Sequence, residues 1–98
     1  MKESKFQSDL IDELEYIFPG CIVTKQDSSF RQGIPDLIIL WKDRWAMLEC
    51  KRSANEPFQP NQKYYIRKAN KVSFGAVIFP ENREEVLHAL EQSFRPRR

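Results

Sequence analysis

Two apolar runs joined by a short polar turn make up residues 33–51, GIPDLIILWKDRWAMLECK. The first run is residues 37–41, the second is residues 45–51, and the turn between them is residues 42–44. Runs of this length, rich in β-branched and aromatic residues and separated by a short turn, are typical of a β-hairpin. We therefore expect a hairpin at the centre of the fold.

The hairpin carries three charged residues at places where a buried sheet would not need them. Asp36 opens the first run, and Glu49 and Lys51 interrupt the second. Because side chains alternate across a strand, Glu49 and Lys51 point the same way. Leu48 and Cys50 then point to the other face. If the two runs pair, Asp36 lies beside Glu49 and Lys51, which predicts two carboxylates and an amine at one spot.

Helical and extended segments flank the hairpin. Apolar residues recur at helical spacing from residue 6 to residue 18 and stop at Pro19-Gly20. The other predicted elements are a strand at 22–26, polar loops at 27–34 and 52–59, a basic helix from Pro60 to about residue 70, a strand at 74–79 and a helix from Asn82 to residue 94. The strand-helix-strand step after the hairpin predicts a parallel pair. We expect an α/β fold of order αβββαβ plus a C-terminal helix, with helices flanking a small mixed sheet.

The 98 residues suggest one domain, with a core at about 3–94 and a basic tail at 95–98. The apolar runs are too short to cross a membrane, and the start has no secretion signal, so we expect a cytoplasmic protein without a membrane partner. Cys21 and Cys50 form no CxxC pair, which argues against zinc and favours two buried thiols.

The charge distribution suggests a polyanionic partner. Residues 1–20 are mainly acidic and residues 42–71 mainly basic, which would suit nucleic acid. Ordinary solvated surface charge is an equally good explanation at this point. The candidate DNA-contacting residues are Ser29, Arg31 and Gln32 in the loop before the hairpin, Arg52 after it, and Lys63 and Arg67 on the basic helix.

Two adjacent carboxylates repel each other unless a cation lies between them, and hard oxygen ligands favour Mg²⁺ or Mn²⁺. Asp36 and Glu49 would suffice to hold Mg²⁺ against a phosphodiester. Lys51 would position or deprotonate the attacking water and offset the negative charge that develops on the phosphorus centre. The alternative is structural: Glu49 and Lys51 form an exposed ion pair on an edge strand, and Asp36 caps a turn.

The G-x-P-D motif at 33–36, the E-x-K motif at 49–51, Gln62 on the following helix and Glu3-Ser4 near the start resemble one nuclease family. It is the virus-type replication-repair nuclease (VRR-NUC) domain, a branch of the PD-(D/E)xK superfamily. The resemblance extends from about residue 3 to about residue 90. It implies a restriction-endonuclease-like core and a metal-dependent endodeoxyribonuclease.

The resemblance also implies roles for single residues. Asp36 and Glu49 would bind the metal, with the backbone carbonyl of Cys50 and the side chain of Glu3 as further ligands. Glu13, also on the polar side of the first helix, competes with Glu3 for that role, and the sequence leaves the choice open.

In the same resemblance Lys51 is the catalytic lysine, and Gln62 is a supporting polar residue near it. Stand-alone domains of this type are similar to phage-encoded, structure-selective endonucleases of DNA recombination and repair, which resolve four-way (Holliday) junctions as homodimers. This implies Mg²⁺, with Mn²⁺ able to substitute, branched DNA as partner, and the host cytoplasm if the chain is phage-encoded. Two alternatives stay open: a nuclease of the same chemistry acting on flaps, single strands or linear duplex, and a non-catalytic nucleic-acid-binding module.

Overall fold

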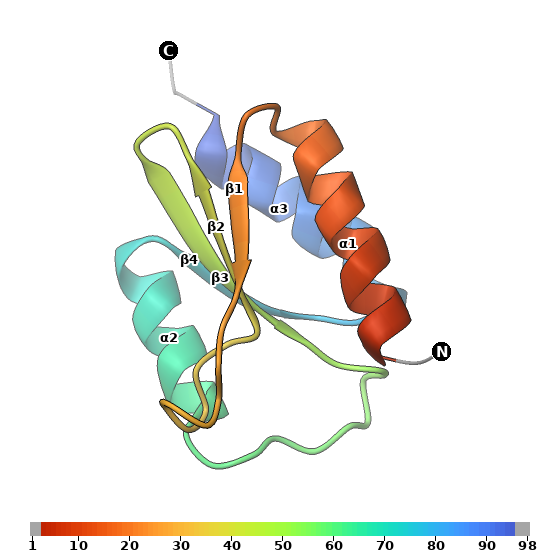
Figure 1. The fold of residues 1–98 in the computed structure, drawn as a ribbon, viewed down its shortest axis with the longest axis vertical. Coiled ribbons are helices and arrows are strands. Elements are labelled where there is room, and N and C mark those ends of the chain that lie inside the picture. Colours follow the sequence, from red (N-terminus) through yellow and green to blue (C-terminus); the bar gives the residue numbers. More distant parts are fainter. Residues whose placement is uncertain (1–2, 96–98) are drawn as a thin grey trace.

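The computed structural model describes residues 3–95, with side chains from Ser4 onward. A four-stranded mixed sheet forms its centre, in the order β1-β2-β3-β4 (Figure 1). The elements are α1 (Glu3–Ile17), β1 (Ile22–Lys25), β2 (Leu37–Trp41), β3 (Arg44–Cys50), α2 (Gln62–Val72), β4 (Phe74–Ile78), the short 3₁₀ helix η1 (Pro80–Asn82) and α3 (Arg83–Phe94). The first three strands pair antiparallel, and β3 pairs parallel with β4. The predicted fold class is therefore confirmed.

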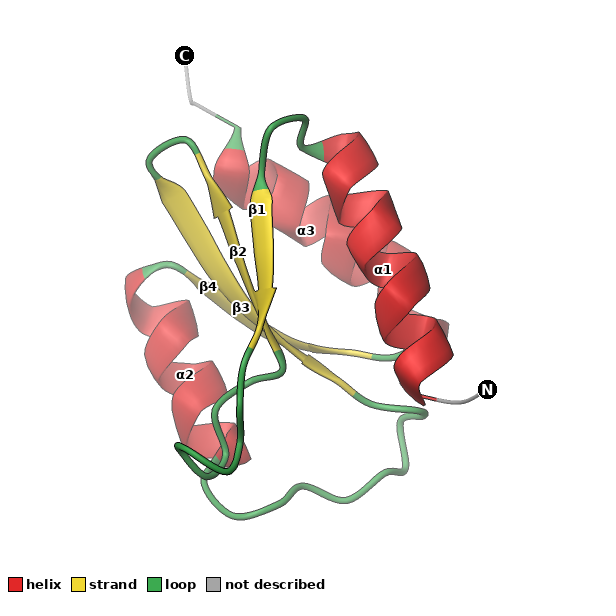
Figure 2. Cartoon of the chain, in the orientation of Figure 1, coloured by secondary structure: helices red, strands yellow, loops and turns green. Residues whose placement is uncertain are grey.

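Helices cover both faces of the sheet unequally. Figure 2 shows α1 and α3 on one side and α2 on the other. The core lies under α1 and α3, where Leu48 and Cys50 of β3 are buried with apolar residues of both helices. Glu49 and Lys51 alternate with them and face the side of α2, as the period of a strand requires.

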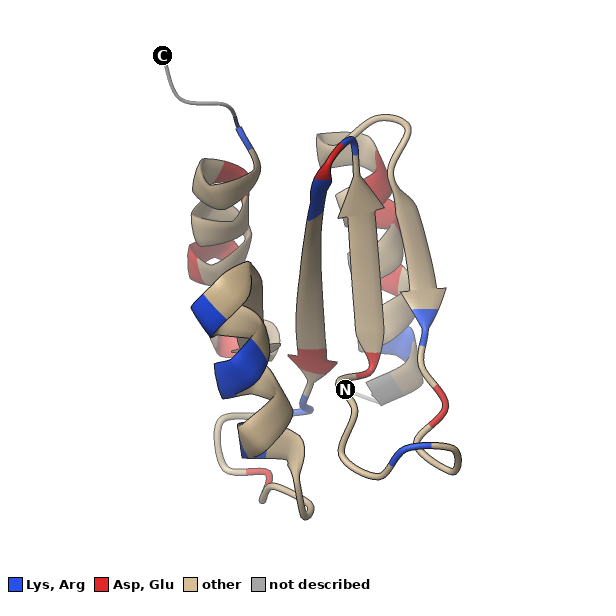
Figure 3. Ribbon diagram, turned by 90° about the vertical axis from the view of Figure 1, so that its left-hand side faces the viewer, with Lys and Arg blue, Asp and Glu red and all other residues tan. Residues whose placement is uncertain are grey.

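Helix α2 packs against β3 and β4 and leaves the rest of that face of the sheet uncovered. A Cβ atom on Gly75 of β4 would lie 2.6 Å from the carbonyl oxygen of Ile66 and 2.9 Å from Cβ of Ala69, so α2 approaches the backbone of β4 directly. The cross-strand partners Ile22 and Leu40 are 59% and 43% exposed. Figure 3 looks onto this face, with α2 to the left and the bare strands beside it.

The observed boundaries differ from the predicted ones mainly at α2. Pro60 was expected in its first turn, but the helix begins at Gln62, whose N–H donates to the carbonyl of Gln59 in a preceding turn. Asn61, which lies between Pro60 and Gln62, has a left-handed backbone conformation with φ 71°. Cys50 is buried as expected, whereas Cys21 is half-buried and its thiol donates to the carbonyl of Leu14 at 3.7 Å.

Residues 96–98 of the predicted basic tail lie outside the described residues. Within residues 3–95, none of the helices combines the length and apolar character that a membrane crossing would require.

Gly33, in the loop before β2, lies close to the backbone of the loop before α2. It has φ +86°, and a Cβ atom there would lie 2.5 Å from both the carbonyl oxygen of Pro60 and Cβ of Asn61. Gly33→Ala is expected to lower the free energy of unfolding by roughly 2–4 kcal/mol, from backbone strain plus steric overlap. Urea denaturation measures this.

Gly20→Ala is the matched control, because Gly20 has the same φ of +86° but nothing within 4 Å of its Cβ position. Gly20→Ala is expected to lower the free energy of unfolding by about 1 kcal/mol, from the backbone conformation alone. If both variants lose the same free energy of unfolding, the contact of Gly33 with the loop before α2 does not contribute to stability.

Candidate active site

Pairing of β2 with β3 brings the two hairpin carboxylates together. Leu37 lies opposite Leu48, which places Asp36 next to Glu49. The backbone N–H of Asp36 donates to Oε1 of Glu49 at 3.2 Å, and the N–H of Cys50 donates to Oδ2 of Asp36 at 2.9 Å. The juxtaposition expected from the hairpin is thus present in the structure.

Lys51 is buried among oxygen acceptors. Its Nζ donates to Oε1 of Gln62 at 2.8 Å and to the carbonyl of Pro57 at 3.1 Å. Oε2 of Glu49 lies 3.7 Å away and Oε2 of Glu56 3.9 Å away. Glu49 and Lys51 are each only 3% exposed, and β3 is an interior strand. The alternative of an exposed ion pair on an edge strand is therefore wrong.

Gln62, the first residue of α2, connects these groups. Its Nε2 donates to Oε2 of Glu49 at 2.9 Å, while its Oε1 accepts from Lys51 and, at 2.8 Å, from the backbone N–H of Gln59. The side-chain amide thus uses both ends, one toward the acid and one toward the amine. Its predicted place beside Lys51 is the observed one, and its catalytic role stays a prediction.

The surroundings of Asp36 shift its pKa. Burial raises the pKa of Asp36 above its ordinary value and outweighs the hydrogen bonds from Cys50 and Glu49 and the charge of Lys51, which lower that pKa. A bound divalent cation would relieve the repulsion between two carboxylates at these positions.

These groups open onto a cavity of about 390 Å³ between the loop before β2, the end of β3 and the start of α2. Its lining residues are Ser28, Gln32, Gly33, Ile34, Asp36, Glu49, Lys51, Glu56, Gln59 and Gln62.

Glu56 is an acidic lining residue that the sequence did not single out. Its Oε1 accepts from the backbone N–H of Arg52 at 2.7 Å and from Nε of Arg52 at 3.1 Å. Burial raises the pKa of Glu56, but these hydrogen bonds and the charges of Lys51 and Arg52 outweigh it, so that the pKa lies below its ordinary value. The i, i+4 spacing of Arg52 and Glu56 was the only signal for it, and charged pairs at that spacing are common.

The donor set fits Mg²⁺. Asp36 and Glu49 supply hard carboxylate oxygens, and Mg²⁺ commonly takes one or two carboxylates, completing its shell with water and substrate phosphate. Among the described residues, no group of three or more His, Cys, Asp or Glu side chains is arranged to hold a metal. A ligand role for the carbonyl of Cys50 stays a prediction.

The sequence left Glu3 and Glu13 as candidates for the acid on the first helix, and the structure describes the side chain of Glu13 only. The side chain of Glu3 lies outside the described residues, although the first turn of α1 lies next to the end of β3 (Figure 1). Glu13 lies elsewhere: it forms an ion pair with Arg83 of α3, whose Nε donates to its Oε1 at 2.7 Å. That contact directs Glu13 toward α3 and away from the cavity.

Comparison with known proteins identifies the fold. No protein-family model matches the sequence, and no curated protein matches it significantly. A solved structure described as a "VRR_NUC domain protein" superposes with a TM-score of 0.64 at 19% sequence identity, over 96% of this chain and 88% of that chain. The chain has the fold of a VRR-NUC domain. The four-stranded sheet, its flanking helices and the C-terminal helix all belong to the shared architecture.

Within this VRR-NUC fold, the three candidate DNA-contacting residues in the loop before β2 have different surroundings. Gln32 lines the site cavity. Arg31 is exposed, with its guanidinium 5.6 Å from the ring of Phe30. Ser29 donates from its backbone N–H and from its hydroxyl to Oδ1 of Asp27, at 2.9 and 2.6 Å. A turn therefore accounts for Ser29, whereas Gln32 and Arg31 stay available to a ligand.

The candidate DNA-contacting residues after β3 also differ in their surroundings. Arg52 is paired with Glu56 at 3.1 Å. Lys63 and Arg67 are exposed on α2, and Nζ of Lys63 lies 5.0 Å from the ring of Phe58 at the rim of the site. Arg67 lies one helical turn further along the same face. Contacts of these residues with DNA stay a prediction.

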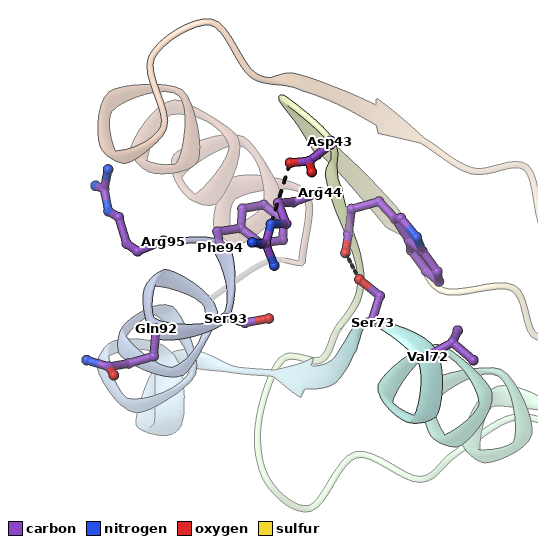
Figure 4. Close-up of a pocket in the computed structure, with 9 residues that line it drawn as sticks. Asp43, Arg44, Val72, Ser73, Gln92, Ser93, Phe94 and Arg95 are labelled. Carbon is purple, nitrogen blue, oxygen red and sulfur yellow. Dashed lines mark hydrogen bonds and ion pairs between the residues drawn. The ribbon is translucent and has the colours of Figure 1, made fainter. Parts of the chain in front are cut away.

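A larger cavity, about 820 Å³, lies at the opposite end of the sheet of the VRR-NUC fold, between the β2–β3 turn and the ends of α2 and α3 (Figure 4). Among the described residues that line it, Asp43 is the only acid, and it is paired with Arg44 at 3.5 Å. Arg95 extends away from the hollow in Figure 4. Cavity size alone therefore does not indicate the candidate site, because the adjacent carboxyl groups of Asp36 and Glu49 line the smaller cavity.

Proposed function

We propose that this protein is a Mg²⁺-dependent DNA endonuclease that hydrolyses phosphodiester bonds. The observation that carries the proposal is the network of buried Glu49 and Lys51 with half-buried Asp36 and Gln62, which opens onto a surface cavity. A buried carboxyl group, a buried amine and a second, half-buried carboxyl group beside them are costly to fold, because each must be desolvated. Such groups gather at sites where a reaction needs them.

Asp36 and Glu49 would hold the metal, with Glu3 and the Cys50 carbonyl as further ligands and Mn²⁺ able to replace Mg²⁺. When bound, the ion supplies charge stabilisation at the phosphate and lowers the pKa of water. Gln62 keeps the carboxylate of Glu49 and the amine of Lys51 at fixed positions relative to each other.

Lys51 has a narrower role in this proposal than the sequence allowed. Two carboxylates, an amide oxygen and a backbone carbonyl surround its Nζ, and the amine donates hydrogen bonds to the amide oxygen and to the carbonyl. Its expected contribution is therefore to offset the negative charge that develops on the phosphate, rather than to remove a proton from water. The charge is positioned before the substrate arrives, which avoids reorganisation during the reaction.

We further propose that the substrate is branched DNA, with the four-way junction as the leading candidate, and that the enzyme acts as a homodimer. The support is the resemblance of the motifs to stand-alone phage resolvases, together with exposed cations on α2 beside the cavity. A two-fold dimer would present two sites to the two equivalent strands of a two-fold junction. Light scattering of the purified protein measures the oligomeric state.

The direct test is cleavage of a labelled four-way junction and of linear duplex, each with Mg²⁺ or with EDTA. We expect paired nicks near the branch point that require Mg²⁺, and much slower cutting of the linear duplex. Absence of metal-dependent cleavage of any DNA would reject the nuclease and favour a non-catalytic binding module. A monomer that cuts linear DNA equally well would instead favour the version acting on unbranched substrates.

A further inference from the structure

The open face of the sheet contains a second hollow, which the proposed chemistry does not use. This apolar hollow has a volume of about 330 Å³. Its apolar and aromatic walls are Ile34, Trp45, Met47, Tyr65, Ala69 and Val72. It exists because α2 covers β3 and β4 but not the strands beyond them (Figure 3). Its volume is at the lower end of the range for pockets that bind small organic groups.

The apolar hollow adjoins the active-site cavity. Ile34 lines both of them, and Asp36 follows it by two residues. A group bound in the hollow would therefore lie close to a phosphate held at the carboxylates. A nucleotide next to the scissile bond has that geometry, with an aromatic base joined to a phosphate.

The charges around the apolar hollow favour an anionic partner. Arg31 and Lys68, both exposed, complete its lining, and no acid occurs among the described residues that line it. Figure 3 shows Lys and Arg on α2 and on the loop that follows β1, on either side of the bare strands. A second copy of this chain docked symmetrically here would bring like charges together, whereas a nucleic-acid strand complements them.

We propose that the apolar hollow binds an unpaired base of the DNA strand whose phosphate lies at Asp36 and Glu49. The proposal rests on the proposed function for the identity of the ligand. Trp45 and Tyr65 offer aromatic surface for stacking, and Arg31 and Lys68 contact the backbone beside the base. A base inside a continuous duplex must first leave its stack to enter, so this pocket favours branched or single-stranded DNA.

Trp45 provides a direct probe. The chain has two tryptophans, and Trp41 is 5% exposed in the core beside Phe18 and Phe94. Titrating the protein in EDTA with a single-stranded thymidine oligonucleotide is expected to quench the tryptophan fluorescence, and a blunt duplex of equal length is expected to quench it much less. In Trp45→Phe the quench should vanish. A quench that persists in Trp45→Phe, or that duplex produces equally, would overturn the proposal.

A charge added to the wall of the apolar hollow gives an independent measurement. Val72 is 70% exposed, so Val72→Glu is compatible with folding. It is expected to weaken binding of the single strand in EDTA roughly tenfold, in line with the loss of one stacked base. The matched control is Tyr16→Glu, at a residue 86% exposed on α1, which adds the same charge on the other layer of the fold. Equal weakening in both variants would overturn the proposal, because long-range repulsion would then explain it.

Three further outcomes distinguish base binding in the apolar hollow from a contact between copies and from the proposed nuclease function. A wild-type dimer that Val72→Glu converts to a monomer would make the apolar hollow a contact between copies and would overturn the base-binding role. Mg²⁺-dependent junction cleavage without any Trp45 quench would reject the base pocket and leave the proposed function standing. A Trp45 quench without metal-dependent cleavage would reject the nuclease alone.

Discussion

Lys51→Ala is expected to abolish cleavage and to destabilise the fold. Removing a preorganised charge from the site should slow cleavage by roughly 10²- to 10³-fold or more. The same change removes the hydrogen bonds from the amine to the carbonyl of Pro57 and to Oε1 of Gln62, and it removes the positive charge 3.7 Å from Oε2 of Glu49. Breaking a buried ion pair from one side costs about 3–5 kcal/mol, and the side-chain exposures of 3% for Lys51 and 4% for Glu49 exclude strong solvent screening. Urea denaturation and single-turnover cleavage measure the two effects.

Lys42→Ala is the control for loss of a lysine. Lys42 lies in the β2–β3 turn at the opposite end of the sheet, with its Nζ 4.5 Å from the ring of Trp41. Its removal is expected to cost at most about 1 kcal/mol and to leave cleavage unchanged. If Lys51→Ala cut DNA at the wild-type rate, the buried amine would be structural, and the chain would not be a nuclease of the proposed kind.

Asp36→Asn is expected to abolish cleavage as well, but to stabilise the metal-free protein. The amide oxygen can still accept the hydrogen bond from the N–H of Cys50, while the buried negative charge next to Glu49 is lost. Replacing a residue that serves function at the expense of folding commonly yields about 1 kcal/mol, or about 4–8 °C in Tm for a domain of this size. Thermal unfolding in EDTA measures the gain.

The sign of the pH dependence follows from the raised pKa of Asp36. The folded state keeps the proton of Asp36 to a higher pH than the unfolded state does. The favourable contribution of protonated Asp36 is therefore fully present in acid and is lost as the pH rises through the folded-state pKa. The Tm difference between Asp36→Asn and wild type should accordingly widen from acidic to neutral pH in EDTA. A constant difference would show that burial of the charge is not the cause.

Mg²⁺ should reverse the order of stability of these two proteins. An ion that binds only the folded state raises Tm with increasing concentration. Wild type is expected to gain Tm with added Mg²⁺, whereas Asp36→Asn, which lacks one of the two carboxylates, should gain little. Equal gains would mean that the ion binds elsewhere.

The local part of the site was predictable from the sequence because it depends on geometry that every strand shares. Alternation of side chains predicts that Glu49 and Lys51 point together, and a short turn predicts that Asp36 returns beside them. The hydrogen bond from Asp36 to Glu49 and the ion pair of Glu49 with Lys51 agree with both expectations. Gln62 could be placed only with the help of a family resemblance, because its contact depends on how α2 docks.

The sequence by itself determined the hairpin, the mixed sheet and the meeting of Asp36 with Glu49 and Lys51, since each follows from periodicity and short connections. Tertiary structure decided which other residues join them. The loop after β3 brings Glu56 to the amine, and packing of α1 against α3 pairs Glu13 with Arg83. Docking of α2 over β3 and β4 alone leaves the apolar hollow open. These outcomes rest on contacts between residues far apart in the chain or in irregular loops, which carry no periodic signal.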